Sequence, residues 1–344
     1  MSSFRNFKAL IITMSDGLAW PVTRSLWLSG ITVHVMGQLP GSMLARSVEC
    51  SKYHLFQDIR WENGVLDISM MTEVLDVVRK CGIDVVLAAD LSTNFLLSRW
   101  YLEEKNRDIT VITPTPETIL LLHDKWKLTS ILDKLGLPYP ESELTYTSED
   151  ILNTKIEFPI ITKPLDQASS KGVQLHWTKS DLIRRIEKKT LFDGFPLLVQ
   201  KYIPGDDIGY SFLAKDGKMV ASALCRQKKR GIRQYFNDNR MNNYVSSLLS
   251  ESEYNGVGHI DARYDPDKDD YRILEVNPRF WASVLYVTSA GVNIPEYLVR
   301  LSRGESLEPI IPHNRSIRLN LYERTVTLAV RTAEIYYFSI GLAK

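Results

Sequence analysis

Cysteine is scarce in this chain and neither sign of charge dominates, and both features exclude classes of protein. The 344 residues include three cysteines, 42 Lys and Arg, and 41 Asp and Glu, for a formal net charge of +1. Cys50, Cys81 and Cys225 are widely spaced without a CxxC pair, which predicts neither a disulfide framework nor a cysteine zinc site. The balanced charge predicts no general attraction to nucleic acid or to an anionic membrane.

Long apolar runs are also missing. No segment approaches the roughly 20 apolar residues that cross a bilayer. Residues 1–8 lack the hydrophobic segment of a signal peptide. The three cysteines are then expected to be small buried hydrophobes in a reducing compartment. We therefore expect a cytoplasmic protein that has no membrane partner and no nucleic-acid partner.

Several signatures of common protein classes are absent. No GxGxxG follows the first expected strand, which disfavours a Rossmann dinucleotide site, and the histidines show no HxxH or HExxH spacing. No GxSxG elbow is present, so a serine hydrolase is not supported. A Walker A sequence is also absent. An EF-hand beginning at Asp265 fails because its sixth position is Asp270 rather than Gly and its twelfth is Val276 rather than Glu.

The first third of the chain alternates apolar runs with helical patterns. We expect buried strands at 8–14, 31–36, 83–88 and 111–112, and helices at 20–29, 72–80 and 94–104. This alternation predicts a doubly wound α/β domain. The Pro-rich stretch at 113–116 is the best domain boundary.

The rest of the chain changes from helices to antiparallel strands. A long helix is expected at 117–135, strands at 158–163, 173–177 and 197–202, and a helix at 179–189. Antiparallel strands follow at 208–214 and 219–226, then a hairpin whose strands, 258–263 and 274–279, are joined by a polar turn at 265–270, and a helix at 295–303. We therefore expect an α/β domain followed by an α+β part.

The hairpin is the most informative part of the sequence. Glu275 and Asn277 are two residues apart, so they point to the same face of a strand. In the register that centres the turn on residue 268, Asp261 lies directly across from Glu275. Two carboxylates and an amide oxygen are hard ligands of the kind that Mg²⁺ prefers. A one-residue slip would turn Asp261 to the other face and leave a polar, solvated hairpin.

Cations elsewhere in the chain could complete a metal–phosphate centre. Arg279 lies two residues beyond Asn277, close enough to meet an anion held by the metal. Lys163 ends an apolar strand and Lys125 lies on the long helix, and lysines as point charges suit phosphates. Taken alone, Lys125 would be a solvated helix residue.

Two loops and a basic run could bind other parts of a ligand. The small, polar loop 166–172 could wrap phosphate oxygens with its backbone N–H groups, or be an ordinary hairpin loop. Ile203 and Asp207 follow a strand end, where they could meet an adenine and a ribose or simply terminate the strand. The basic run 226–230, with Arg233, is either an anion clamp or a solvated loop.

Taken in order, these segments resemble the ATP-grasp superfamily. Residues 275–291 look particularly like its carbamoyl-phosphate-synthase-type and carboxylate–amine-ligase members, and the resemblance covers about residues 1–305. Residues 274–279 are specific to the family. The loop that ends at residues 170–173 and Lys125 are weak signals alone, and their order along the chain gives them weight. The matching segments are Asp124-Lys125, Ile161-Thr162-Lys163-Pro164, Ser170-Lys171-Gly172-Val173, residues 199–205 (VQKYIPG) and residues 274–279 (LEVNPR).

The resemblance implies an ATP-grasp fold that combines α/β and α+β parts. ATP would lie between a lid domain and a C-terminal lobe. Homodimers are common in this superfamily, so a homodimer is left open. The implied parts are a pre-ATP-grasp doubly wound α/β domain at 1–115, a small lid domain at 116–200, a C-terminal antiparallel lobe with the metal site at 201–310, and a helical extension at 311–344.

The same resemblance assigns roles to site residues. Asp261, Glu275 and Asn277 would hold one or two Mg²⁺ ions, for which Mn²⁺ could substitute. Arg279 and Arg230 would act as catalytic residues that stabilise the transferring phosphoryl group or the carboxyl of an acyl phosphate. The residues expected to bind the nucleotide are Lys125, Lys163, Ser169, Ser170, Gly172, Gln200, Lys201, Tyr202, Ile203 and Asp207.

Two departures from the family pattern affect these roles. Lys201 stands where the family often has Glu, which puts one ribose or adenine contact in doubt. Residues 231–243 lack the glycine-rich stretch of many relatives, which puts the substrate loop on the nucleophile side in doubt.

The implied function is that of an ADP-forming carboxylate–amine ligase. Such an enzyme makes an acyl phosphate from ATP and a small-molecule carboxylate, and passes the acyl group to an amine such as an amino acid. Two alternatives stay open: a bicarbonate-phosphorylating, carboxylase-type enzyme, and a nucleotide-binding module that has lost catalysis. Ser15, Asp16, Arg24 and Asp90 lie at expected strand ends of the first domain, where α/β sheets bind ligands, so they could border the substrate.

Overall fold

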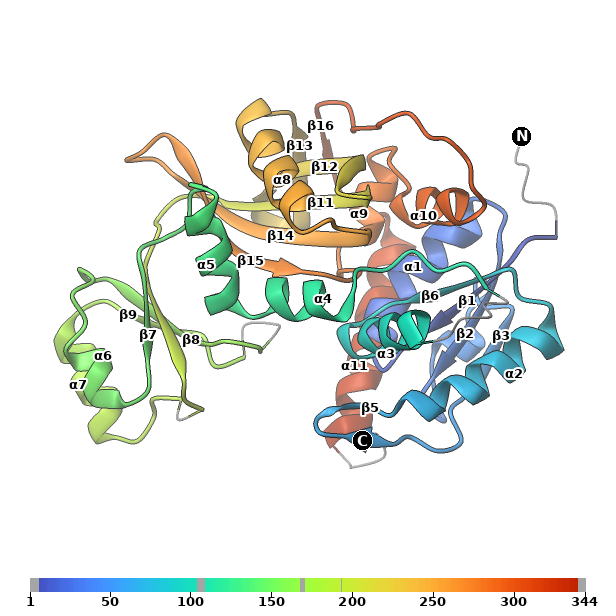
Figure 1. Cartoon of the computed structure of the whole chain (residues 1–344), viewed down its shortest axis with the longest axis horizontal. Coiled ribbons are helices and arrows are strands. Elements are labelled where there is room, and N and C mark those ends of the chain that lie inside the picture. The colour runs from blue at the N-terminus through green and yellow to red at the C-terminus, as the bar shows by residue number, and fades with distance from the viewer. Residues whose placement is uncertain (1–5, 104–108, 168–170, 193, 340–344) are drawn as a thin grey trace.

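The computed structural model describes residues 6–103, 109–167, 171–192 and 194–339. Its three larger sheets follow one another along the longest axis of the molecule (Figure 1). A parallel sheet built from the N-terminal residues lies at one end, a small four-stranded sheet at the other, and a six-stranded antiparallel sheet between them. The predicted combination of α/β and α+β parts is confirmed.

The N-terminal domain is built on a parallel sheet in the order β3-β2-β1-β6. Successive residues of β1 face opposite sides, since Ala9 and Ile11 belong to one buried cluster and Leu10 and Ile12 to another. Both faces are therefore covered, as a doubly wound domain requires. The strands are β1 (Lys8–Ile12), β2 (Thr32–Gly37), β3 (Lys52–Leu55) and β6 (Val85–Ala88), with a separate pair β4 (Trp61–Glu62) and β5 (Val65–Leu66); the helices are α1 (Asp16–Leu28), α2 (Met71–Cys81) and α3 (Leu91–Glu103), with short turns η1 (Leu44–Arg46) and η2 (Ile68–Met70).

Two boundaries in this domain differ from the sequence prediction. The helix expected at 20–29 already begins at Asp16, because the carbonyl of Ser15 accepts hydrogen bonds from the N–H groups of Leu18 and Ala19 at 3.1 and 3.0 Å. The strand expected at 111–112 does not form, and nearby Thr110 makes only an isolated bridge with Val85.

A small antiparallel sheet in the order β7-β10-β8-β9 forms the opposite end of the molecule (Figure 1). Its core is a cluster of six buried side chains that includes Ile151 of α6, Leu182 of α7 and Val199 of β10. Strand β7 was not predicted from the sequence. The elements are β7 (Ser142–Thr145), α6 (Ser148–Leu152), β8 (Ile160–Pro164), β9 (Gln174–His176), α7 (Lys179–Glu187) and β10 (Leu197–Lys201).

The single helix expected at 117–135 is wrong, because the chain forms two helices, α4 (Pro116–His123) and α5 (Lys125–Lys134). Asp124 between them has an extended backbone, and its side chain accepts hydrogen bonds from the N–H groups of Trp126 and Lys127, both at 2.9 Å. A side-chain cap of this kind satisfies the free N–H groups at the start of a helix. The break therefore comes from Asp124 acting as the N-cap of α5.

The largest sheet is antiparallel, in the order β15-β14-β11-β12-β13-β16. Tyr210 and Ile260 on one of its faces share a buried cluster with Leu122 of α4, Leu128 of α5 and Met241 of α8. This packing favours grouping α4 and α5 with the large sheet, so we propose that the lid begins nearer to β7 than to residue 116. The elements are β11 (Asp207–Lys215), β12 (Lys218–Lys228), η3 (Lys229–Gly231), β13 (Ile232–Phe236), α8 (Asn239–Glu251), β14 (Gly256–Asp265), β15 (Asp270–Asn277), α9 (Val284–Ser289), α10 (Ile294–Ser302) and β16 (Arg315–Ile317).

Helices α9 and α10 join the large sheet to the N-terminal domain. One continuous buried cluster contains Trp20 and Leu26 of α1, Val284 of α9, Leu298 of α10 and Leu213 of β11. Burial of apolar surface across this boundary holds the two parts together as one body.

The C-terminal helix, α11 (Leu321–Ser339), packs beside α1 (Figure 1). Trp20 Nε1 donates a hydrogen bond to Thr327 Oγ1 at 3.1 Å. The Tyr322 hydroxyl donates to the buried carboxylate of Glu49, which also pairs with Arg24 at 2.9 Å. Among the described helices, this one included, none combines the length and apolar character that a membrane crossing needs.

Removing the cap of α5 tests the origin of the helix break. Asp124→Ala is expected to lower the free energy of unfolding by about 1 kcal/mol, because two N–H groups of α5 lose their acceptor. Asp124→Asn keeps an acceptor oxygen and is the matched control. Chemical and thermal unfolding followed by circular dichroism would measure both variants. Equal stability of Asp124→Ala and the unmodified chain would contradict the capping role.

Candidate functional site

The β14–β15 hairpin brings the predicted metal ligands together. Asp261 pairs with Glu275 and His259 with Asn277, so the predicted register is confirmed at these positions. The Asn277 amide Nδ2 donates to Asp261 Oδ2 at 3.1 Å. Two carboxylates and an amide oxygen therefore lie on one face of the two strands, and this donor set suits Mg²⁺.

The register shifts immediately beyond the site. Ala262 pairs with Ile273, so Leu274 has no partner across the ladder and forms a β-bulge. The Leu274 carbonyl accepts a hydrogen bond from Lys163 Nζ at 3.2 Å. The bulge thus supplies an acceptor that ties the small sheet to the large one.

Lys163 is a buried cation at the end of β8, only 6% exposed. Burial, together with the nearby charge of Lys125, lowers the pKa of Lys163 to about 7, although Glu275 and Asp261 partly oppose the shift. An additional anion beside this amine would stabilise its protonated form. The Lys163 amine is therefore expected to take up a proton when an anionic ligand binds beside it.

Lys125 is buried beside Glu275, with its Nζ 3.6 Å from Glu275 Oε2. It is the first residue of α5, and its backbone N–H donates to the Leu165 carbonyl at 3.0 Å. Its Nζ also donates to the Gln167 carbonyl at 2.8 Å. The Asp124 cap is thus followed directly by a buried cation beside Glu275.

Arg279 completes the group of cations. Its guanidinium donates to Asn277 Oδ1 at 2.9 Å and to the Phe280 carbonyl at 2.7 Å. Burial lowers the pKa of Arg279, while Asp90, Glu275 and Asp261 act in the opposite direction. An arginine remains charged under such a shift, so Arg279 presents a fixed positive charge beside the two carboxylates.

His259 supports Asp261 from the neighbouring position on β14. Its Nε2 lies 3.4 Å from Asp261 Oδ1, its Nδ1 contacts Ser211 Oγ at 3.0 Å, and its ring stacks on Trp281. Burial alone would raise the pKa of Asp261, but His259, Arg279 and Arg233 lower it below the ordinary value. Asp261 is therefore an ionised carboxylate at neutral pH.

These groups, apart from Lys125, line a cleft of about 1120 Å³ where the three parts of the chain meet. Gly172 directly precedes Val173, which lines the cleft. Its φ of +76° is one that residues with a side chain rarely adopt, and the ring of Pro164 lies 3.0 Å from where a Cβ would stand. Ser169 and Ser170 lie outside the described residues, and the side chain of Arg230 is likewise not described. The predicted site residues that line the cleft are Lys163, Gln200, Lys201, Tyr202, Ile203, Asp207, Asp261, Glu275, Asn277 and Arg279.

One end of the cleft is apolar and follows β10. Ile203 is buried there, and Ile161, Val173 and Ile208 line the same end. The N–H groups of Lys201 and of Tyr202 donate to the carbonyls of Glu141 and Pro159, so they are engaged within the protein.

The polar side chains at this end have varied surroundings. Gln200 is buried and its Nε2 donates to Ser142 Oγ at 3.0 Å, across the β10–β7 ladder. Lys201 Nζ is 3.7 Å from Glu157 and largely solvated. Asp207 is exposed, with its Oδ1 3.4 Å from Arg263 Nε. Asp207 is therefore free to accept hydrogen bonds from a ligand on its solvent side.

The other end of the cleft contains residues that sequence reasoning missed. Arg324, Arg331 and Glu334 of α11 line it together with Arg233 of β13. Glu334 Oε2 accepts a hydrogen bond from the Gly17 N–H at 2.9 Å, at the start of α1. The sequence carries no local signal for this placement, because it depends on α11 packing beside α1.

The basic run 226–230 is partly neutralised. Arg226 Nε lies 3.2 Å from Asp206 Oδ2, and Lys228 Nζ lies 3.9 Å from the same atom. Arg233 is the neighbouring cation that lines the cleft, with its guanidinium over the ring of Tyr286.

Four residues were expected to border the substrate, and of these Ser15 lines the cleft. Asp16 is buried against Ser42 and Tyr53, and burial raises its pKa to about 6. Arg24 pairs with Glu49. Asp90 accepts hydrogen bonds from the N–H groups of Met14 and Thr93 and so stabilises the loops at the sheet edge.

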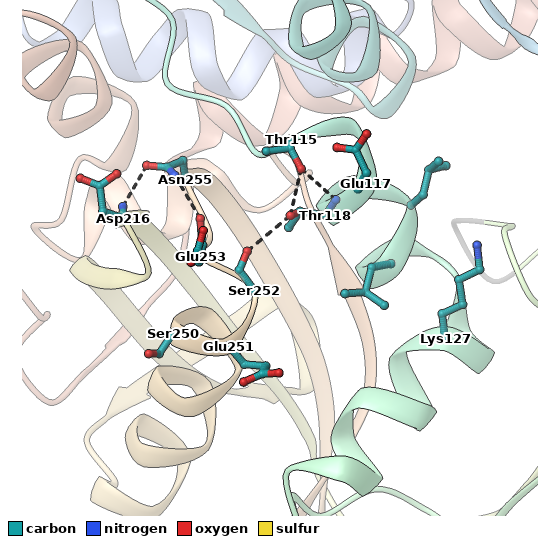
Figure 2. Close-up of a pocket in the computed structure, with 12 residues that line it drawn as sticks. Thr115, Glu117, Thr118, Lys127, Asp216, Ser250, Glu251, Ser252, Glu253 and Asn255 are labelled. Atoms are coloured by element: carbon teal, nitrogen blue, oxygen red, sulfur yellow. Dashed lines mark hydrogen bonds between the residues drawn. The ribbon is translucent and has the colours of Figure 1, made fainter. Parts of the chain in front are cut away.

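A second hollow, of about 1020 Å³, lies between the start of α4 and the end of α8 (Figure 2). Its polar groups contact one another: Thr115 caps α4, and Thr118 Oγ1 donates to the Ser252 carbonyl at 3.4 Å. None of the predicted site residues is among the described residues that line it.

Comparison with known proteins gives agreeing results. Residues 194–325 match the family model described as "ATP-grasp in the biosynthetic pathway with Ter operon". The chain is 22% identical over 248 residues to the carbamoyl phosphate synthase large chain, C-terminal section, of Methanopyrus kandleri, covering 65% of this chain and 44% of that protein. It is 24% identical over 235 residues to D-aspartate ligase of Enterococcus faecium, covering 58% of this chain and 55% of that protein.

The fold is similar to solved structures of low sequence identity. The biotin carboxylase domain of Hydrogenobacter thermophilus 2-oxoglutarate carboxylase, solved with MgADP, ADP and bicarbonate, has a TM-score of 0.65 and 18% identity, covering 87% of this chain and 70% of that one. The chain spans about half the length of the two curated relatives above. Residues 194–325 are thus similar to the ATP-grasp family, and the chain shares its fold with the solved biotin carboxylase domain.

Proposed function

We propose that the chain is an ATP-dependent, ADP-forming carboxylate–amine ligase that acts through an acyl phosphate. The observation that carries this proposal is the convergence of Asp261, Glu275 and Asn277 with the buried Lys163 and the partly buried Arg279 at one cleft. Phosphoryl transfer depends mostly on positioning and charge neutralisation, and this group of side chains supplies both.

The nucleotide would occupy the apolar end of the cleft. Ile203 would contact the adenine, and Asp207 would accept hydrogen bonds from the ribose hydroxyls. Lys163 and Lys125 would meet phosphate oxygens, as their burial next to the hairpin allows. The lowered pKa of Lys163 supports this assignment, because a triphosphate compensates the cost of charging a buried amine.

Asp261, Glu275 and Asn277 would hold one or two Mg²⁺ ions, and Mn²⁺ could replace Mg²⁺. When bound, the metal would neutralise negative charge on the transferring phosphoryl group. His259 and Arg279 orient Asp261 and Asn277, respectively, through the contacts described above. Arg279 would stabilise the phosphoryl group or the acyl-phosphate carboxyl.

The end of the cleft near α11 favours an anionic substrate, such as the carboxylate that accepts the phosphoryl group. Arg233 of β13 and Arg324 and Arg331 of α11 line the cleft together with Glu334 of α11, so cations outnumber carboxylates among these four residues. A substrate carboxylate oxygen would attack the γ-phosphorus as the bond to the ADP oxygen breaks. The amine nitrogen would then attack the acyl carbon, lose a proton and release phosphate.

Bicarbonate is a second candidate for the carboxylate, which would give carboxyphosphate. The bicarbonate in the complex of the Hydrogenobacter domain favours considering it. The two candidates differ in product. An organic carboxylate would give a new amide that retains the whole carbon skeleton of that carboxylate, and bicarbonate would not.

A substrate panel tests the proposed function. Pooled carboxylates, amino acids and bicarbonate would be incubated with ATP, with and without Mg²⁺, and ADP, phosphate and new amides would be measured. The proposal predicts Mg²⁺-dependent release of ADP together with an amide of the combined mass. Nucleotide binding without turnover across the panel would instead identify a module that has lost catalysis.

Replacing Glu275 tests the metal centre. Glu275→Gln is expected to lower turnover by about 10³-fold or more, because one charge at the metal is worth several kcal/mol in the transition state. Glu117→Gln, on the exposed surface of α4, is the matched control and is expected to keep full turnover. Circular dichroism would show that both variants are folded. Near-normal turnover of Glu275→Gln would defeat the metal assignment.

Replacing Lys163 tests the phosphate contact. Lys163→Ala is expected to weaken binding of ADP or a non-hydrolysable ATP analogue by about 10- to 100-fold, since a hydrogen bond to a charged group is lost. Lys179→Ala, at an exposed lysine that begins α7, is the control. Isothermal titration calorimetry would measure both. An unchanged affinity of Lys163→Ala would remove this lysine from the site.

Proton uptake gives a second test of Lys163. Its pKa in the free protein is about 7, below the ordinary 10.5, so the unfolded chain holds more protons between these values and the contribution of Lys163 to stability rises with pH across that range. A bound polyphosphate raises the pKa again. Near pH 8, calorimetry in buffers of different ionisation enthalpy is therefore expected to show proton uptake on nucleotide binding. The same uptake in Lys163→Ala would assign it to another group.

A further inference from the structure

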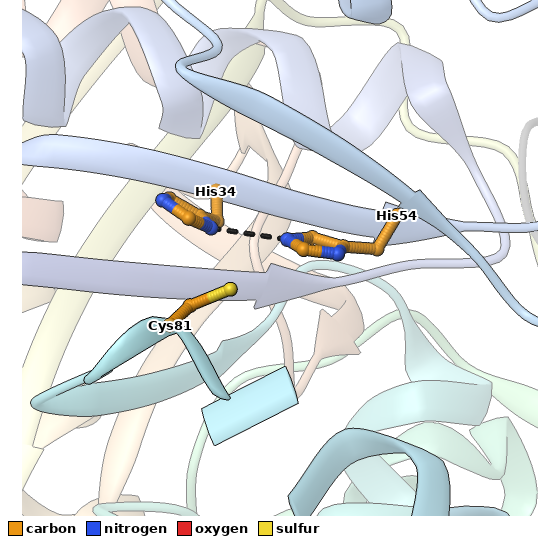
Figure 3. Close-up of side chains that lie close together, drawn as sticks. All are labelled: His34, His54 and Cys81. Atoms are coloured by element: carbon orange, nitrogen blue, oxygen red, sulfur yellow. Dashed lines mark hydrogen bonds between the residues drawn. The ribbon is translucent and has the colours of Figure 1, made fainter. Parts of the chain in front are cut away.

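Three metal-ligating side chains meet in the N-terminal domain, outside the cleft (Figure 3). His34 comes from β2, His54 from the neighbouring strand β3, and Cys81 is the last residue of α2. One ligand atom from each lies within 4.8 Å of the others. His34 and His54 are on the sheet face that α2 covers, as Met36, the partner of His54 across the ladder, packs with Val74 and Val78.

The two imidazoles are already close to a chelating spacing. His34 Nδ1 and His54 Nε2 are 3.0 Å apart, and the rings stack with centroids 5.3 Å apart. Two nitrogens bound tetrahedrally to zinc, each at about 2.0 to 2.1 Å, are about 3.3 Å apart. A metal could therefore replace the hydrogen bond between the rings with a small movement of each, and the Cys81 thiol lies within 4.8 Å of a nitrogen on each ring.

The donor set selects the kind of metal. Two imidazole nitrogens and a thiol suit zinc and similar metals, whereas Mg²⁺ prefers the oxygen donors found in the cleft. Cys81 is a free cysteine, and burial lowers the pKa of both histidines, which favours the neutral imidazoles that a metal requires. Lys8 donates from Nζ to the Cys81 carbonyl at 2.7 Å, which ties the end of α2 to the start of β1.

The sheet separates this group from the cleft. Lys8 begins β1 and contacts Cys81, so the group lies toward the amino ends of the parallel strands. Ser15, which lines the cleft, follows the carboxyl end of β1. The two sites are thus at opposite ends of the parallel strands.

We propose that His34, His54 and Cys81 form a binding site for a zinc-class divalent metal, with water as the fourth ligand. Such a metal would join the end of α2 to the edge of the β2–β3 pair and stabilise the N-terminal domain. The three residues are far apart in the sequence, which explains why no short spacing motif reveals them.

Zinc binding by the full chain tests the proposal. Equilibrium dialysis with Zn²⁺ in excess Mg²⁺ is expected to give one tightly bound zinc per chain. His54→Gln and Cys81→Ser, both at partly exposed positions, are expected to weaken binding by more than about 100-fold, since even changes outside the ligand shell cost about 10- to 100-fold. His313→Ala and Cys50→Ala are the matched controls and are expected to bind as the unmodified chain does.

Two further readouts keep the test independent of folding defects and of the cleft. Co²⁺ bound to the unmodified chain is expected to show a thiolate-to-cobalt charge-transfer band that Cys81→Ser lacks. Glu275→Gln is expected to retain the zinc, because its carboxylate belongs to the other site. Absence of the cobalt band, or unchanged zinc affinity in both His54→Gln and Cys81→Ser, would overturn the proposal and leave a hydrogen-bonded histidine pair only.

Discussion

The site depends on holding two carboxylates beside three cations, of which Lys125 and Lys163 are buried. These two buried lysines would be costly without carboxylates nearby. Placed together, each charge compensates others across the β14–β15 hairpin, as the contact of Lys125 with Glu275 shows most directly. The compensation is incomplete, as the lowered pKa of Lys163 shows, and an anionic ligand with a divalent metal would complete it.

Each part of the chain contributes to this balance of charge. The small sheet supplies Lys163, α5 supplies Lys125, and the large sheet supplies the carboxylates. Lys163 reaches the Leu274 carbonyl that the β-bulge leaves unpaired, so the small sheet contacts the large one through a residue of the site itself. Any movement of the small sheet relative to the hairpin would therefore change the environment of this amine.

The hairpin could be predicted from the sequence because its physics is local. Alternation along a strand and a polar turn fix which side chains share a face, and Asp261 indeed pairs with Glu275. The break between α4 and α5 is also local, but the apolar pattern on both sides of Asp124 predicts one continuous helix, because a capping Asp and a helical Asp look alike in a sequence. Arg324, Arg331 and Glu334 could not be placed, because only the packing of α11 on α1 brings them to the cleft.

Diffraction from a crystal of the chain with MnADP would test the central claim most directly. Mn²⁺ scatters anomalously and replaces Mg²⁺ at oxygen ligands, so its position can be located without assumption. The account predicts an anomalous peak within about 2.0 to 2.3 Å of carboxylate oxygens of Asp261 and Glu275, with the ADP phosphates beside Lys163. A manganese peak away from this hairpin, or ADP bound outside the cleft, would contradict it.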